Sequence, residues 1–268
     1  GLCRGYNFDN VTLDPVRFAT VFLLDAGGTV LDQSATDEDG SYLFTDIPAN
    51  TDVRVRVRAE SINRVGTQRW EVAVRDNTSN IGVSLPSRPI YEVQWALFNS
   101  GSTNTTNANF TAGTGWTGSG YDDQQRLAAP LAILDSMLNG ILLIASVDDT
   151  FDMGTLNAFW SVNNTYSRTE RWDDPDNGQL VTAFYTSGGS GSGPSLFLRG
   201  DAVGRFPESN INTDEFDAYV ILHEWGHFFE DQLSRSDSRG GYHAIPGTVD
   251  ARVAFGEGWG NAIGASAS

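Results

Sequence analysis

The sequence predicts two domains, an all-β sandwich followed by an α+β domain. Short alternating runs separated by turn signals fill the chain up to about residue 88, whereas longer helical runs occur only in the second half. Between them, residues 100–120 are rich in Gly, Ser, Thr and Asn, which is typical of a linker or a long surface loop. We therefore expect a sandwich over 1–88, a strand and linker over 89–120, and the second domain over 121–268.

The first part of the chain predicts strands joined by tight turns. Its clearest run is DVRVRVRAE at 52–60, where every second residue is valine and the residues between are arginine. A period of two places the valines on one buried face. Turn signals such as DAGG, DEDG and DNTSN separate the runs. The expected strands lie at 17–25, 41–47, 52–60, 69–76 and within 86–99.

Residues 36–59 carry a recognisable pattern. Gly40, Tyr42 and Phe44 are followed by Ile47-Pro48 and then by the valine-arginine strand. In this arrangement the segment resembles the carboxypeptidase regulatory-like (transthyretin-like) β-sandwich. The resemblance covers about residues 1–85 and implies a fold, but it says little about function.

The second part of the chain predicts helices mixed with strands. A helical pattern with acidic residues near its start covers 121–147, and two more helices are expected at about 213–233 and 250–264. The loop WDDPDNG at 172–178 is consistent with either a cation site or a solvated turn. Strand-like runs lie at 156–162, 180–186 and 195–200.

Composition excludes several kinds of partner. The formal net charge is −17, and all 17 basic residues are arginine. Such an acidic surface repels nucleic acid and anionic membranes. No apolar run reaches the roughly 18 to 20 residues of a membrane span. Because an acidic surface keeps a protein soluble in salt or outside a cell, we expect a secreted or cell-surface protein without a membrane span or a nucleic-acid partner.

The motif HEWGH predicts a metal site. His223 and His227 are two of only three histidines in the chain. On a helix, residues i and i+4 share one face, so both imidazoles can reach one zinc ion. Glu224 would lie beside them and could take a proton from a water held by the metal. The alternative is a pair of core histidines with ordinary hydrogen bonds.

A zinc site needs a third protein ligand. The metzincin pattern would place a histidine at position 233, where this chain has Leu233. Two candidates remain. One is His243 in the loop GGYHAIPG, and the other is a carboxylate, Glu257, in VAFGEGWGNAIGA. Small residues around Glu257 would let its helix press closely against the first.

HEWGH followed by FGEGWGNA resembles the gluzincin zinc metallopeptidases, the thermolysin-like group. The resemblance implies a zincin-like second domain, a Zn²⁺ cofactor and Glu257 as third ligand. It also implies that the side chain at 261 holds the free N–H of His223. In the group that side chain is a carboxylate, whereas here it is Asn261, a neutral acceptor.

The function implied is a zinc peptidase, with an endopeptidase expected because no acidic clamp for a substrate amine is recognisable. Tyr242 and His243 are candidate oxyanion donors or ordinary loop residues. Residues 195–200 are a candidate edge strand for pairing with an extended peptide, and Arg199 could meet a substrate carboxylate or be a surface arginine.

Two further expectations concern the whole chain. Only eleven residues follow Glu257, which suggests either a minimal peptidase domain or one that is truncated at its C-terminus. The alternative function, from another class, is an extracellular binding or adhesion protein with a structural or degenerate metal site.

Overall fold

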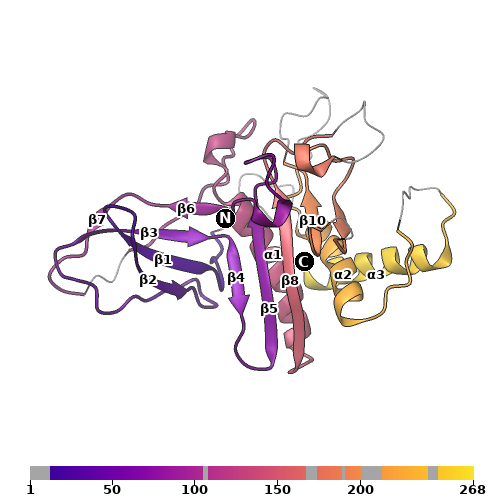
Figure 1. Ribbon diagram of the computed structural model, residues 1–268, viewed down its shortest axis with the longest axis horizontal. Helices are drawn as coiled ribbons and strands as arrows, with labels where there is room; N and C mark the ends of the chain where they lie inside the picture. Colours follow the sequence, from indigo (N-terminus) through magenta and orange to yellow (C-terminus); the bar gives the residue numbers. More distant parts are fainter. Residues whose placement is uncertain (1–12, 105–107, 167–173, 189–190, 201–212, 241–246) are drawn as a thin grey trace.

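The computed structural model describes residues 13–104, 108–166, 174–188, 191–200, 213–240 and 247–268. Within these residues it contains two five-stranded sheets and three α-helices, arranged as Figure 1 shows. The chain therefore has the mixed α and β content that the sequence predicts. No helix in the described segments combines the length and the apolar character needed to cross a membrane.

The first sheet is antiparallel and has the strand order β2-β1-β3-β6, with β7 also paired to β3. The valines of β3 lie on the buried face, as the alternation predicts. On the opposite face, Arg56 and Arg58 cover the ring of Phe22, at 5.3 and 4.7 Å from its centre. The strands are β1 Thr20–Asp25, β2 Val30–Ala35, β3 Asp52–Arg58, β6 Glu92–Gln94 and β7 Phe98–Asn99.

One strand prediction in this region is wrong. Residues 41–47 form no strand, and β1 pairs instead with Val30–Ala35, which follows the DAGG turn. In 41–47 the exposed and half-buried residues alternate as expected, but none of them is fully buried. Alternation of side-chain burial is therefore not sufficient to predict which segment pairs with β1.

The second sheet has the order β4-β5-β8-β10-β9. Its three central strands, β5, β8 and β10, are parallel, whereas β4 and β9 are antiparallel to their neighbours. The bounds are β4 Glu60–Asn63, β5 Gln68–Arg75, β8 Phe151–Trp160, β9 Phe184–Thr186 and β10 Ser195–Leu198.

The strand β5 was expected in the first domain, yet it pairs with β8 along most of its length. The boundary expected near residue 88 thus does not coincide with the division between the two sheets. The division of the chain into domains stays a prediction.

The helices α1 and α2 lie against the second sheet, and α3 lies against α2 (Figure 1). The first, α1 (Ala129–Ala145), packs against β5 and α2; α2 (Ala218–Leu233) also contacts β8, β9 and β10. The last, α3 (Ala251–Ala267), packs mainly on α2. The main core cluster includes side chains from both sheets and from α1 and α2, with Trp160 and Trp225 among its largest fully buried members.

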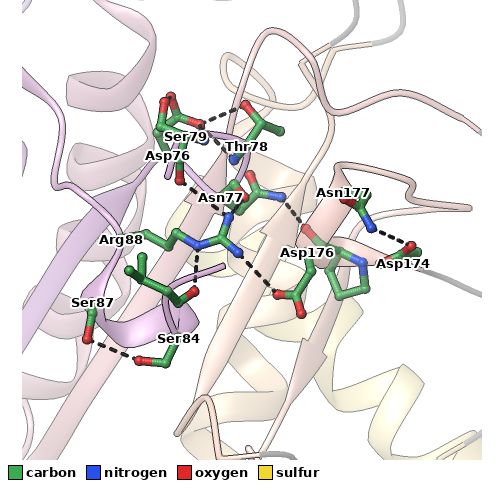
Figure 2. Close-up of polar contacts among 12 residues, drawn as sticks. Asp76, Asn77, Thr78, Ser79, Ser84, Ser87, Arg88, Asp174, Asp176 and Asn177 are labelled. Atoms are coloured by element: carbon green, nitrogen blue, oxygen red, sulfur yellow. Dashed lines mark hydrogen bonds and ion pairs between the residues drawn. The ribbon is translucent and has the colours of Figure 1, made fainter. Parts of the chain in front are cut away.

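A buried arginine joins the segment after β5 to the turn that precedes β9 (Figure 2). Arg88 is only 2% exposed, and its guanidinium donates to the backbone oxygens of Val83 and Asn77. It also lies 3.7 Å from the carboxylate of Asp176, and Asn77 donates to the backbone oxygen of Pro175. The described part of the DDPDNG loop is therefore a turn that is held by Arg88.

Candidate metal centre

The helix α2 begins later than the sequence predicts. It starts at Ala218, and its N-cap is Asp217, whose side chain accepts a hydrogen bond from Val220 N at 3.1 Å. The sequence predicts a start at about residue 213, but Thr213 precedes the helix. The missed signal was Asp217 itself, since aspartate is among the preferred N-cap residues.

Glu215, which lies just before α2, is part of a buried polar network. It is fully buried and forms an ion pair with Arg126, and its other oxygen accepts from Trp160 Nε1 at 3.3 Å. Arg126 also donates to the backbone oxygen of Gly200 at 2.6 Å. Burial raises the pKa of the Glu215 carboxyl, while the arginine opposes that rise. This network fixes the entry to α2 against the ends of β8 and β10.

The two histidines of α2 lie on the helix face that turns away from the sheet core. Ile221, Trp225 and Phe228 occupy the opposite face and are buried. The side chains of His223 and His227 keep 16% and 20% of their exposure, so they are not enclosed in the core. Local helix geometry and the apolar pattern together direct both imidazoles to one accessible place.

The helix α3 brings Glu257 to the same place. Its N-cap is Asp250, which accepts from Arg252 N at 2.9 Å. Further along, Trp259 stacks on Phe229 of α2 and donates to the backbone oxygen of Gly226 at 3.0 Å. These contacts fix the rotation of α3 about its axis. As a result, Glu257 and Asn261 of α3 face the histidines of α2.

The three expected ligands converge. His223 Nε2 lies 3.2 Å from His227 Nε2 and 3.2 Å from Glu257 Oε2, and His227 Nε2 lies 3.7 Å from Glu257 Oε1. In the described part of the chain this is the only group of three or more His, Cys, Asp or Glu side chains placed to share a metal ion.

These distances suit a zinc ion. Tetrahedral ligands at about 2.0–2.2 Å from zinc lie roughly 3.3–3.6 Å from one another. Two imidazole nitrogens and one carboxylate oxygen are also a donor set that zinc prefers. The three side chains are 16%, 20% and 25% exposed, which leaves a side of the cluster open to solvent. An open position distinguishes a catalytic zinc site from a closed structural one.

Asn261 lies next to the first of the two histidines. Its Oδ1 lies 3.2 Å from His223 Nδ1, and the same oxygen accepts from the hydroxyl of Tyr219 at 2.8 Å. An imidazole that donates from Nδ1 to this oxygen keeps the lone pair of Nε2 directed toward the cluster. Tyr219 was not identified from the sequence, although its position four residues before His223 places it on the same helix face.

Glu224 lies beside the ligands with a perturbed acidity. Burial raises the pKa of its carboxyl to about 8, and the charge of Glu257 adds to the rise. The backbone N–H of Tyr185 donates to the carboxylate and opposes the shift. A carboxylate with a pKa near neutrality can accept and release a proton at physiological pH. Tyr185 belongs to β9, so this strand borders the site.

The prediction that residues 195–200 form an edge strand is wrong. The strand β10 pairs with β8 on one side and with β9 on the other, so β9 is the edge strand on this side of the sheet. All four residues of β10 are buried, as is typical of an interior strand rather than of an edge strand that lines a cleft. Arg199 is not at a free surface either: its backbone N–H donates to Asp214 at 2.7 Å, and its guanidinium lies 3.5 Å from that carboxylate.

Two candidate site residues cannot be placed. Tyr242 and His243 lie outside the described residues. Comparison of the chain with protein-family models, with curated proteins and with solved structures found no match.

Proposed function

We propose that this protein is a zinc-dependent peptidase of the gluzincin type that hydrolyses peptide bonds in a peptide or protein substrate. The observation that carries the proposal is the convergence of His223, His227 and Glu257 from two helices, with Glu224 beside them. A purely structural metal site would need neither a basic carboxylate next to the ligands nor an open side.

In this proposal, metal binding, ligand orientation and proton transfer are each assigned to different residues of the chain. The two histidines and Glu257 would hold the ion, and Asn261 would orient His223. A zinc ion so held supplies a Lewis acid that acidifies water and polarises a carbonyl group. Glu224 would accept the proton of the attacking water and then deliver it to the nitrogen of the leaving amine. Glu224 lies close enough to the cluster for this role, since the charge of Glu257 acts on its carboxyl group.

The substrate would bind along β9. This strand is at the edge of its sheet, and its residue Tyr185 contacts Glu224 through the backbone. An exposed edge can pair with an extended peptide through main-chain hydrogen bonds, which read the backbone rather than the side chains. An endopeptidase with broad side-chain preference would follow from such binding.

The finer architecture belongs to the same proposal. We place a zincin-like α+β domain on the second sheet and its helices, and a transthyretin-like sandwich module around the first sheet. The acidic charge of −17 supports a secreted or cell-surface setting.

The test combines metal analysis with hydrolysis of an unfolded, generic protein substrate. The full chain is dialysed against zinc and its metal content is measured. We expect one zinc per chain and cleavage of the substrate. Glu224→Gln should keep the zinc and lose at least about 100-fold in kcat, since general acid–base catalysis contributes that much or more. His227→Ala should lose both the zinc and the activity.

A matched control is Asp231→Asn, which alters a carboxylate on the same helix that bonds Tyr185 rather than the cluster. It should retain zinc. Undiminished cleavage by Glu224→Gln, or absence of zinc from the unaltered protein, would refute the proposal.

A further inference from the structure

We propose that Tyr219 is a positioning residue of the metal centre: acting through Asn261, its hydroxyl holds His223 in the tautomer that can bind the ion. The inference rests on the proposed function in one respect, the identity of the site as a metal site. It assigns a role to a residue outside the ligand set, and it explains how a neutral amide can work at position 261.

The contact geometry is a chain of three groups. Tyr219 lies one turn before His223 on α2, and its hydroxyl donates to Asn261 Oδ1 at 2.8 Å. The same oxygen lies 3.2 Å from His223 Nδ1. A carbonyl oxygen has two lone pairs, so one Oδ1 can accept from both the phenol and the imidazole.

The orientation of the Asn261 amide decides which tautomer His223 adopts. When Oδ1 faces Nδ1, the imidazole proton lies on Nδ1, and Nε2 presents its lone pair to His227 and Glu257. If the amide turned by half a rotation, its NH₂ group would donate to Nδ1. The proton would then move to Nε2, which lies 3.2 Å from Glu257, and that nitrogen could not bind a metal.

A carboxylate at position 261 would not raise this problem. Both of its oxygens are acceptors, so either orientation keeps the proton on Nδ1. An amide has one acceptor end and one donor end, and Asn261 is an exposed residue whose surroundings do not enclose it. A second group is therefore needed to favour the acceptor end.

Tyr219 is placed to supply that second group. A phenolic hydroxyl is a better donor than acceptor, because its lone pairs are partly delocalised into the ring. Bonding to Tyr219 thus favours the orientation in which Oδ1, not NH₂, lies between the two donors. The ring itself is held by close packing on α3: a Cβ at Gly264 would lie 3.2 Å from two of its carbon atoms and 3.1 Å from the Tyr219 backbone oxygen.

The experiment uses the full chain, with zinc itself as the probe, titrated in competition with a chromophoric chelator. Tyr219→Phe keeps the ring and removes only the hydroxyl. We expect its zinc affinity to fall by about 3- to 10-fold, less than the 10- to 100-fold that loss of a direct ligand partner causes. In an Asn261→Asp background the same substitution should change the affinity less than about 2-fold, because a carboxylate needs no orientation.

A second measurement needs no metal. Nitrogen NMR of the metal-free protein reports which ring nitrogen of His223 carries the proton. Because the Glu257 carboxylate competes for the proton from the Nε2 side, the expected result is a larger Nδ1–H fraction in the unaltered protein than in Tyr219→Phe. Tyr42→Phe is the control: it removes a hydroxyl that donates to the backbone oxygen of Ala108 at 2.5 Å, far from the cluster, and should change neither zinc affinity nor the His223 signals.

The outcomes separate the two proposals. Equal zinc affinity and equal His223 spectra in the unaltered protein and in Tyr219→Phe would overturn the positioning role. So would a loss of affinity that is equally large in the Asn261→Asp background, since Tyr219 would then act through packing alone. If the unaltered protein bound no zinc, the proposed function would fail, while the spectra of the metal-free protein would still decide whether Tyr219 orients His223.

Discussion

Gly260 lies directly against His223: a Cβ on this glycine would be 3.0 Å from both Nδ1 and Cε1 of the imidazole and 3.0 Å from the His223 backbone oxygen. Real side chains essentially never come closer than this, so the separation of α2 and α3 at the metal centre depends on the missing side chain. Because Glu257 and Asn261 flank Gly260 on α3, the same close approach brings both of them to the histidines.

The first prediction follows from this contact. Gly260→Ala should lower zinc affinity by about 10-fold or more, comparable to loss of a ligand's hydrogen-bond partner, because the added methyl group must displace His223 or α3. Chelator competition measures the change. Alanine has the higher helix propensity by about 1 kcal/mol, so a general loss of helix stability would not explain the result.

Gly258→Ala is the matched control on the same helix. A Cβ there meets no atom within 4 Å. This substitution should leave zinc affinity unchanged and raise the free energy of unfolding by about 0.5–1 kcal/mol. Equal zinc affinities in the two alanine variants would contradict the role assigned to Gly260.

The second prediction concerns pH and the metal-free protein. The pKa of the Glu224 carboxyl is about 8 in the folded chain, above its ordinary value of 4.5, so the folded state binds a proton that the unfolded state has released. The free energy of unfolding should therefore fall as pH rises from about 4.5 to 8, with a slope of at most about 1.4 kcal/mol per pH unit from this group.

Urea denaturation in the presence of a chelator tests this, with Glu224→Gln as the reference because glutamine does not titrate. The difference between the two proteins should follow the stated pH window. Adding zinc should reduce it, since a nearby cation favours the ionised carboxylate. Parallel pH profiles for the two metal-free proteins would show that Glu224 titrates normally.

The third prediction concerns the buried ion pair at the entry to α2. Arg126→Met should lower the free energy of unfolding by about 3–5 kcal/mol, because it leaves the carboxylate of Glu215 buried without its partner. The double variant Arg126→Met/Glu215→Leu should recover a large part of that loss, since no charge is then left unpaired. Urea denaturation at neutral pH measures both; additive losses would argue against a paired network.

The fourth prediction is that zinc stabilises the folded chain. A ligand that binds only the folded state at 100 times its dissociation constant contributes about 2.7 kcal/mol. The melting temperature should therefore rise when zinc is added and fall again with a chelator. Mg²⁺ should have little effect, because it prefers octahedral oxygen ligands. His227→Ala should melt at the same temperature with and without zinc, and a shift in that variant would place the binding elsewhere.

The sequence by itself determined the part of the metal centre that lies on a single helix. The four-residue spacing in HEWGH puts His223 and His227 on one helix face whatever the rest of the chain does, since helix period is a property of the backbone. The valine-arginine alternation of β3 likewise specified its buried face without reference to a partner.

Only the tertiary structure decided which distant elements meet. The sequence places β5 in the first domain, but β5 pairs with β8; and β9 rather than β10 is the edge strand next to the metal centre. Alternation specifies the face of a strand and not its neighbour, because the backbone groups that form the ladder are the same in every residue. The contacts of Glu257, Asn261 and Tyr219 at the cluster likewise required the packing of α3 on α2, which depends on small residues such as Gly260 and on stacking such as Trp259 on Phe229.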